Sequence, residues 1–131
     1  MKALLKYQRL TILWALFIFT ICNLNLGGVG KSSFFFEGFD KLTHCGLFFV
    51  LAVFYCNGYL RNNQQYTLTP FAAFVITFVV IVYGAVIELL QLYVFTWRGA
   101  EWADLFCDTV GAGMATFCIL VITTAVKNVK T

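Results

Sequence analysis

The chain has 131 residues, of which 61% are hydrophobic and only 11% are charged. Soluble domains carry roughly 25% charged residues, so a water-soluble fold of this length could not hide so much apolar surface. The formal net charge of +3 is small. No basic run follows the pattern that binds phosphates, so we expect no nucleic acid partner.

Four apolar segments approach the length of about 20 residues that a membrane-spanning helix needs. They cover residues 10–26, 42–60, 71–95 and 103–126. Only helices and closed barrels satisfy their backbone groups in lipid, and these runs are too long for barrel strands. We therefore predict one domain, residues 1–131, that is an all-α integral membrane bundle of four transmembrane helices. Thr69 and Pro70 are expected to begin the third helix.

The first apolar segment follows Lys2, Lys6 and Arg9, a pattern that a secretory signal peptide would share. No A-x-A-like cleavage site comes after it. We therefore expect this segment to be a retained span.

Basic residues predict the orientation. With four spans both termini share one side, which carries six basic residues: Lys2, Lys6, Arg9, Arg61, Lys127 and Lys130. The other side carries Lys31, Lys41 and Arg98. Cytoplasmic loops are enriched in Lys and Arg, so the N and C termini are predicted to be cytoplasmic.

Acidic residues gather on the opposite, outer side. All six lie there or in the outer parts of the spans: Glu37, Asp40, Glu88, Glu101, Asp104 and Asp108. Ionisable groups inside a span cost at least a few kcal/mol and by default mark function. Asp40, Lys41 and His44 open the second span at spacings that place them on one helix face.

Glu88 and Gln91 share a face of the third span, and Asp104 and Asp108 share a face of the fourth. Glu88 lies roughly 10 Å inside the outer end, so its carboxyl group must be protonated, paired or beside water. Arg98, between these spans, suits bidentate binding of a carboxylate or phosphate.

Small residues on the third and fourth spans would let the helices approach closely. They are Gly84, Ala85, Gly111, Ala112, Gly113 and Ala115. His44, Glu88 and Asp108 are then expected to meet at similar depth, in a pocket that opens to the outside. The first span has no ionisable group and is expected to pack around the other three.

Three motifs resemble the VanZ-like family of bacterial membrane proteins. Asp40-Lys41-Leu42-Thr43-His44 matches its Asp-Lys-x-x-His motif, and Glu88-Leu89-Leu90-Gln91 matches its Glu-x-x-Gln motif. Arg98, Asp104 and Asp108-Thr109-Val110-Gly111 match its third motif, although the family usually has Asn at the position of Asp108. The resemblance implies a four-helix protein of the bacterial inner membrane. The founding member is linked to teicoplanin resistance, a role that the resemblance does not transfer.

Three functions remain open at this stage. The first is a site that binds or modifies an envelope lipid, a lipid-linked substrate or another amphipathic ligand. In this hypothesis Glu88, His44 and Asp108 are the catalytic candidates. The ligand-binding candidates are Asp40, Lys41, Gln91, Arg98 and Asp104. The acid in a hydrophobic setting, Glu88, would be the general acid or base.

The second function is cation or proton binding, with a metal held by His44, Glu88 and Asp108 as the less favoured option. The third is a structural or adaptor role, in which buried polar groups fix the helix packing. No cofactor is expected. The five cysteines form no CxxC pair and are interpreted as small apolar fillers. Because four short helices enclose little volume, the chain is a candidate to form a homo-oligomer.

Overall fold

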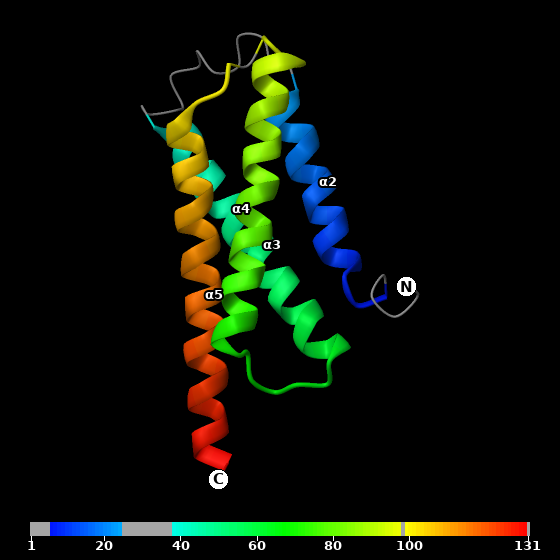
Figure 1. Cartoon of the computed structure of the whole chain (residues 1–131), viewed down its shortest axis with the longest axis vertical. Coiled ribbons are helices and arrows are strands. Elements are labelled where there is room, and N and C mark those ends of the chain that lie inside the picture. The colour runs from blue at the N-terminus through cyan, green and yellow to red at the C-terminus, as the bar shows by residue number, and fades with distance from the viewer. Residues whose placement is uncertain (1–5, 25–37, 98, 131) are drawn as a thin grey trace.

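A computed structural model describes residues 6–24, 38–97 and 99–130. Glu37, Lys31, Lys2 and Arg98, and the roles predicted for them, lie outside these residues. The described chain forms four helices and no strand: α2 (Arg9–Asn23), α3 (Phe39–Asn62), α4 (Pro70–Tyr93) and α5 (Trp102–Lys130) (Figure 1). The prediction of an all-α fold is confirmed.

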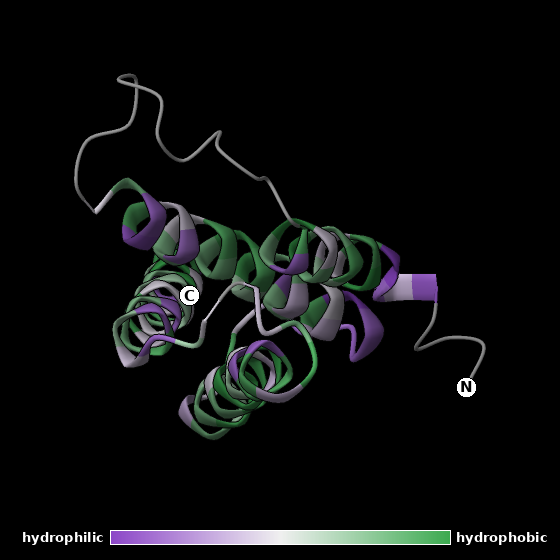
Figure 2. Cartoon of the chain, turned by 90° about the horizontal axis from the view of Figure 1, so that it is seen from above, coloured by the Kyte–Doolittle hydropathy of each residue, from purple (hydrophilic) through white to green (hydrophobic). Residues whose placement is uncertain are grey.

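Three helices, α3, α4 and α5, are long and apolar enough to cross a membrane. Seen from above, the ribbons are mostly hydrophobic along their length (Figure 2). Many large apolar side chains point outward, for example Phe71 at 77% and Phe117 at 65% exposure. Such a surface is suited to lipid rather than to water.

The helix α2 is shorter than the predicted first span. Its 15 residues extend about 22 Å at 1.5 Å per residue, against a hydrocarbon core of roughly 30 Å. Residues 25 and 26, the end of the predicted span, lie outside the described part of the chain.

Helix starts follow local chemistry. The side chain of Thr69 accepts a hydrogen bond from the backbone N–H of Ala72 at 3.2 Å, and Pro70 occupies the first turn of α4, as predicted. The helix α3 begins at Phe39, after Gly38 with a φ of 88°, so it includes Asp40 and Lys41 as well as the predicted span 42–60. Glycine adopts this left-handed conformation without steric cost. The second helix thus gains an extra turn.

Helix ends also differ from the sequence prediction. The helix α4 ends at Tyr93 rather than at residue 95, and α5 continues to Lys130 rather than ending at 126. The hydroxyl groups of Thr123 and Thr124 donate to carbonyl groups one turn earlier, within the helix. These polar side chains are therefore satisfied locally in α5.

The helix α3 runs obliquely behind α4 and α5 (Figure 1) and contacts both. Within the described residues α2 contacts α3 and α4 but not α5. The Trp14 indole donates to the Leu47 carbonyl at 3.0 Å, and the Tyr83 hydroxyl donates to the Ala15 carbonyl at 2.5 Å. These bonds hold α2 against the other helices, as expected for the first apolar segment.

The helices α5 and α3 approach each other closely at Gly111. A Cβ atom there would overlap the backbone carbonyl oxygen of Cys45 and lie 3.1 Å from the backbone nitrogen of Phe49. Gly113, two residues later, has nothing within 4 Å of an added Cβ. Of the two glycines predicted to allow close approach on α5, only Gly111 lies at the contact.

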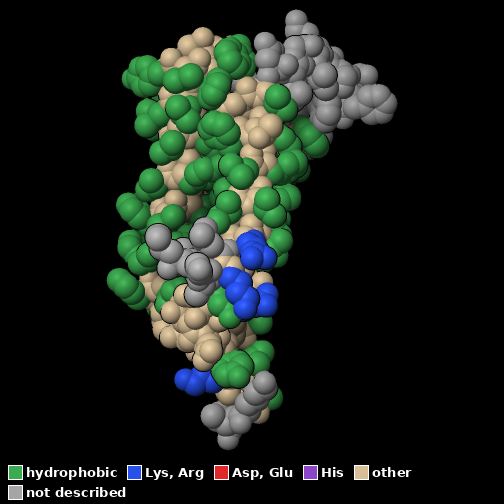
Figure 3. All heavy atoms as spheres, turned by 90° about the vertical axis from the view of Figure 1, so that its right-hand side faces the viewer, with side chains coloured by type: hydrophobic (Ala, Val, Ile, Leu, Met, Phe, Trp, Pro, Cys, Tyr) green, Lys and Arg blue, Asp and Glu red, His purple; other side chains and the backbone are tan. Residues whose placement is uncertain are grey.

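Charged side chains separate along the bundle axis. Lys6 and Arg9 lie by the start of α2, Arg61 lies at the end of α3, and Lys127 lies near the end of α5. Figure 3 shows a face that is largely hydrophobic, with Lys and Arg side chains in its lower part, away from the start of α3. The opposite end, where α3 and α5 begin and α4 ends, carries the acidic residues.

Replacing Gly111 by Ala is expected to lower the free energy of unfolding in detergent by about 1–3 kcal/mol, because the new methyl group must push α5 away from the α3 backbone. Gly113→Ala is the matched control. It should leave stability unchanged or raise it by up to about 1 kcal/mol, because alanine favours a helix over glycine. Equal effects of the two changes would contradict the close approach at Gly111.

Candidate functional site

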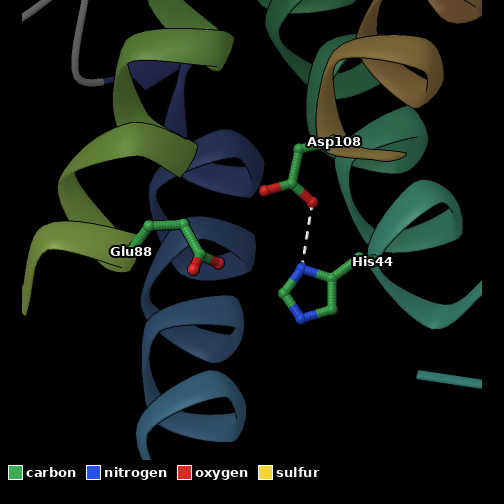
Figure 4. Close-up of side chains that lie close together, drawn as sticks. All are labelled: His44, Glu88 and Asp108. Carbon is green, nitrogen blue, oxygen red and sulfur yellow. Dashed lines mark hydrogen bonds and ion pairs between the residues drawn. The ribbon is translucent and has the colours of Figure 1, made fainter. Parts of the chain in front are cut away.

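His44 of α3, Glu88 of α4 and Asp108 of α5 point toward one another in the interior (Figure 4). We call these three residues the inner cluster. They are 5%, 7% and 1% exposed. One ligand atom from each lies within 4.8 Å of the others. The structure thus brings together the three residues that the sequence singled out as catalytic candidates.

The imidazole of His44 lies between two carboxylates of α5. Its Nδ1 is 3.0 Å from Oδ1 of Asp108, and its Nε2 is 3.9 Å from Oδ2 of Asp104. The ring stacks on Phe48, with 6.5 Å between centroids. Because Asp104 and Asp108 are one helical turn apart, both face the same histidine.

Glu88 has one satisfied and one unsatisfied oxygen. Its Oε2 accepts a hydrogen bond from the backbone N–H of Glu101 at 2.9 Å. Its Oε1 is buried and has no hydrogen-bond partner among the residues that the structure describes. A buried carboxylate oxygen without a donor is costly, and Oδ1 of Asp104 is in the same state, although the Lys41 ammonium lies 3.8 Å from it.

A glycine makes room for Asp108. A Cβ atom on Gly84 would lie 2.8 Å from Oδ2 of Asp108 and 3.1 Å from a ring carbon of Phe48. Gly84 is one helical turn before Glu88 on α4. The missing side chain therefore allows the Asp108 carboxylate to lie directly against the helix that carries Glu88.

A second group lies nearer the surface, and we call it the outer cluster: Asp40, Lys41 and Glu101. The Lys41 ammonium is 2.9 Å from Glu101 and 3.2 Å from Asp40, and it is 3.8 Å from Oδ1 of Asp104. Exposed ion pairs of this kind contribute at most about 1 kcal/mol each. They join the first turn of α3 to the start of α5.

Negative charge dominates this end of the molecule. Five carboxylates (Asp40, Glu88, Glu101, Asp104 and Asp108) and one lysine, Lys41, lie at this end among the described residues. With all five ionised and His44 neutral, five charges of −1 against one of +1 leave a formal −4. A site with this charge favours a cation or a group that donates hydrogen bonds.

Gln91 lies outside the inner cluster. It is 3% exposed, and its Nε2 donates to the carbonyl oxygen of Cys22 on α2 at 2.8 Å. The Trp97 indole likewise donates to the carbonyl of Asn23 at 3.2 Å. These two donors attach the end of α2 to α4 and to the segment that follows α4. The amide group of Gln91, predicted to bind ligand, is therefore used between helices.

A hollow of about 310 Å³ opens between α4 and α5 beside the inner cluster. It is lined by six apolar residues and two acids: Ala85, Leu89, Leu92, Ala100, Trp102 and Leu105, with Glu88 and Glu101. Leu89 and Trp102 are 54% and 88% exposed. The hollow therefore connects the outer, lipid-exposed face of the bundle to Glu88.

Sequence reasoning missed the hollow, because no single residue type marks it. It treated Ala85 as a packing residue, whereas this alanine lines the hollow. It counted Glu101 among the acidic residues but gave it no catalytic or ligand-binding role, although its backbone N–H donates to Glu88 and its side chain pairs with Lys41. Both the hollow and the contacts of Glu101 depend on the distance between α4 and α5.

Cys45, Cys56, Cys107 and Cys118 are free thiols. Cys22 and Cys56 are 2% and 0% exposed within the apolar core, as expected for small fillers. Cys45 and Cys107 form no disulfide. No described cysteine belongs to a group of side chains that could hold a metal.

No family model, no curated protein and no solved structure matches the chain. The resemblance to the VanZ-like family rests on the three motifs alone. Their described members lie together where α3 and α5 begin and α4 ends. Interpretation of the site therefore depends on its geometry.

The buried bond between His44 and Asp108 should contribute more than the exposed pair of Lys41 and Glu101. We expect a double-mutant cycle of His44→Gln and Asp108→Asn to give a coupling free energy of about 1.5–3 kcal/mol, the range for hydrogen bonds to charged groups. The control cycle, Lys41→Met and Glu101→Gln, should give less than about 1 kcal/mol. Equal coupling in unfolding measurements would contradict the account.

Proposed function

We propose that the chain is a VanZ-like protein of the bacterial cytoplasmic membrane with four spans, α2 among them, and cytoplasmic termini. The order and spacing of the three motifs support the family. The basic residues at the start of α2 and at the ends of α3 and α5 support the orientation. In this arrangement the inner and outer clusters lie toward the extracytoplasmic side.

Orientation is testable with single cysteines in a background where the five native cysteines are replaced. Asp40→Cys should react with a membrane-impermeant maleimide added to spheroplasts, because residue 40 is exposed at the cluster end. Asn63→Cys, exposed in the connection between α3 and α4, should react only after permeabilisation. The reverse pattern would place the clusters in the cytoplasm and contradict the proposal.

The proposed ligand is an amphipathic lipid of the cell envelope, and the hollow between α4 and α5 is the observation that carries this proposal. A hydrocarbon chain matches the leucine and alanine side chains of its lining. Glu88 lines the hollow, and its Oε1 has no hydrogen-bond partner among the described residues. One molecule with an apolar chain and a polar head would satisfy both parts.

The charge of the site favours a particular head group. Since the described side chains of the two clusters and Asp104 sum to a formal negative charge, an amine or a sugar hydroxyl suits Glu88 better than an unaccompanied phosphate does. In a reaction on such a lipid, Glu88 would act as the general acid or base, because it is the buried ionisable group that lines the hollow. His44 and Asp108 do not line the hollow, so they would act through Glu88 rather than on the lipid directly.

Blocking the hollow should prevent lipid contact. We expect Ala85→Trp to reduce crosslinking of a phosphatidylethanolamine with a diazirine in its acyl chain by at least about tenfold, because the indole fills the space beside Glu88. The matched control is Val86→Trp, one residue along and 46% exposed but outside the hollow. Crosslinks to wild type should map to Leu89, Leu92 or Leu105.

Two outcomes would contradict the lipid proposal. One is equal crosslinking of the two tryptophan variants in nanodiscs. The other is a crosslink pattern spread evenly over the outer face of α4 and α5.

A structural role is the second candidate, and the buried bond between His44 and Asp108 favours it, since that bond joins α3 to α5. On this account, changing Glu88→Gln and Asp108→Asn together would lower thermal stability and leave lipid crosslinking unaltered. The lipid-binding and structural candidates therefore predict different lipid crosslinking for this double variant.

A further inference from the structure

The inner cluster has the ligand types of a transition-metal site. It offers one imidazole nitrogen and two carboxylate oxygens from three different helices (Figure 4). Catalytic zinc sites commonly use three protein ligands of these kinds and keep a further position open. Ligand atoms around one tetrahedral ion stand roughly 3.4 Å apart, and the three in this cluster lie within 4.8 Å of one another. Small side-chain rotations would bring the three ligand atoms to the spacing found around a single ion.

The unpaired oxygen of Glu88 is an independent sign of a missing partner. The residue is 7% exposed, and Oε1 has no hydrogen-bond donor among the described residues. Figure 4 shows its carboxylate directed toward His44 and Asp108. A bound cation would satisfy this oxygen and offset the two buried carboxylates at once.

The outer acidic residues already have a cation among them. Asp40, Glu101 and Asp104 also lie within reach of a common cation. The Lys41 ammonium already occupies that position, at 3.2, 2.9 and 3.8 Å from these carboxylates. The inner cluster contains no lysine or arginine among the residues described, so its negative charge lacks this compensation.

We infer that His44, Glu88 and Asp108 bind one divalent transition-metal ion, with Zn²⁺ as the best match to the ligand set. Binding displaces the proton shared by His44 and Asp108. Entry is through the hollow, which reaches Glu88 from outside. This inference stands without the lipid proposal.

The test uses the full chain in detergent, stripped with a chelator and titrated with Co²⁺ as a spectroscopic substitute for Zn²⁺. We expect one Co²⁺ per chain, with the visible absorption of a low-coordinate site of nitrogen and oxygen ligands. One equivalent of Zn²⁺ should remove this absorption. Thiolate ligation would add a charge-transfer band in the near ultraviolet, which would identify cysteine binding and overturn the assignment.

Variants of the three proposed ligands, compared with variants of exposed acidic residues, test where the ion binds. His44→Gln, Glu88→Gln and Asp108→Asn should each weaken Co²⁺ binding by at least about tenfold, a loss that even changes beyond the first ligands can produce. The control variants Asp40→Asn and Glu101→Gln alter equally acidic but exposed residues and should stay within about threefold of wild type. Loss of binding in the controls with retention in Glu88→Gln would overturn the assignment.

A measurement on wild type covers the case in which a variant fails to fold. X-ray absorption of the Zn²⁺-loaded protein should show nitrogen and oxygen neighbours, with the scattering signature of a single imidazole. A sulfur shell, or no stoichiometric Zn²⁺ after loading, would overturn the inference.

Discussion

The contact of Gly111 with the Cys45 carbonyl sets the distance between α3 and α5. In lipid no hydrophobic force drives helices together, so association depends on close packing and on hydrogen bonds between helices. At Gly111 two backbones touch, and about one helical turn away His44 meets Asp108 at 3.0 Å. Gly84 makes the equivalent space on α4. Two missing side chains therefore position the inner cluster.

Burial of the inner cluster has a cost that the rest of the structure only partly offsets. His44 and Asp108 satisfy each other, and the backbone of Glu101 satisfies one oxygen of Glu88. The other oxygen has no partner among the described residues, and Glu88 is one of the residues that line the hollow between α4 and α5. A half-satisfied polar network destabilises a structure unless a ligand completes it. The unpaired oxygen of Glu88 therefore links the packing of the helices to the proposed functions.

Sequence patterns predicted the helical class, the cap at Thr69 and the polar residues that meet in the interior. These features depend on hydropathy and on helical spacing, which are local. Other features depend on neighbouring helices. Gly111 and Gly113 look equivalent in sequence, yet only Gly111 faces α3. The amide of Gln91 binds the backbone of α2, and the hollow beside Ala85 depends on the separation of α4 from α5.

The central claim is that the inner cluster is a site reached from outside the bundle rather than a dry structural contact. The most direct measurement is the maleimide reaction rate of Glu88→Cys in a background without native cysteines, with Val80→Cys, 2% exposed on the same helix, as the reference. The account predicts that residue 88 reacts with the impermeant reagent at a rate approaching that of Asp40→Cys, and that residue 80 stays unreactive. If residue 88 is as unreactive as residue 80, the cluster is closed and serves helix packing alone.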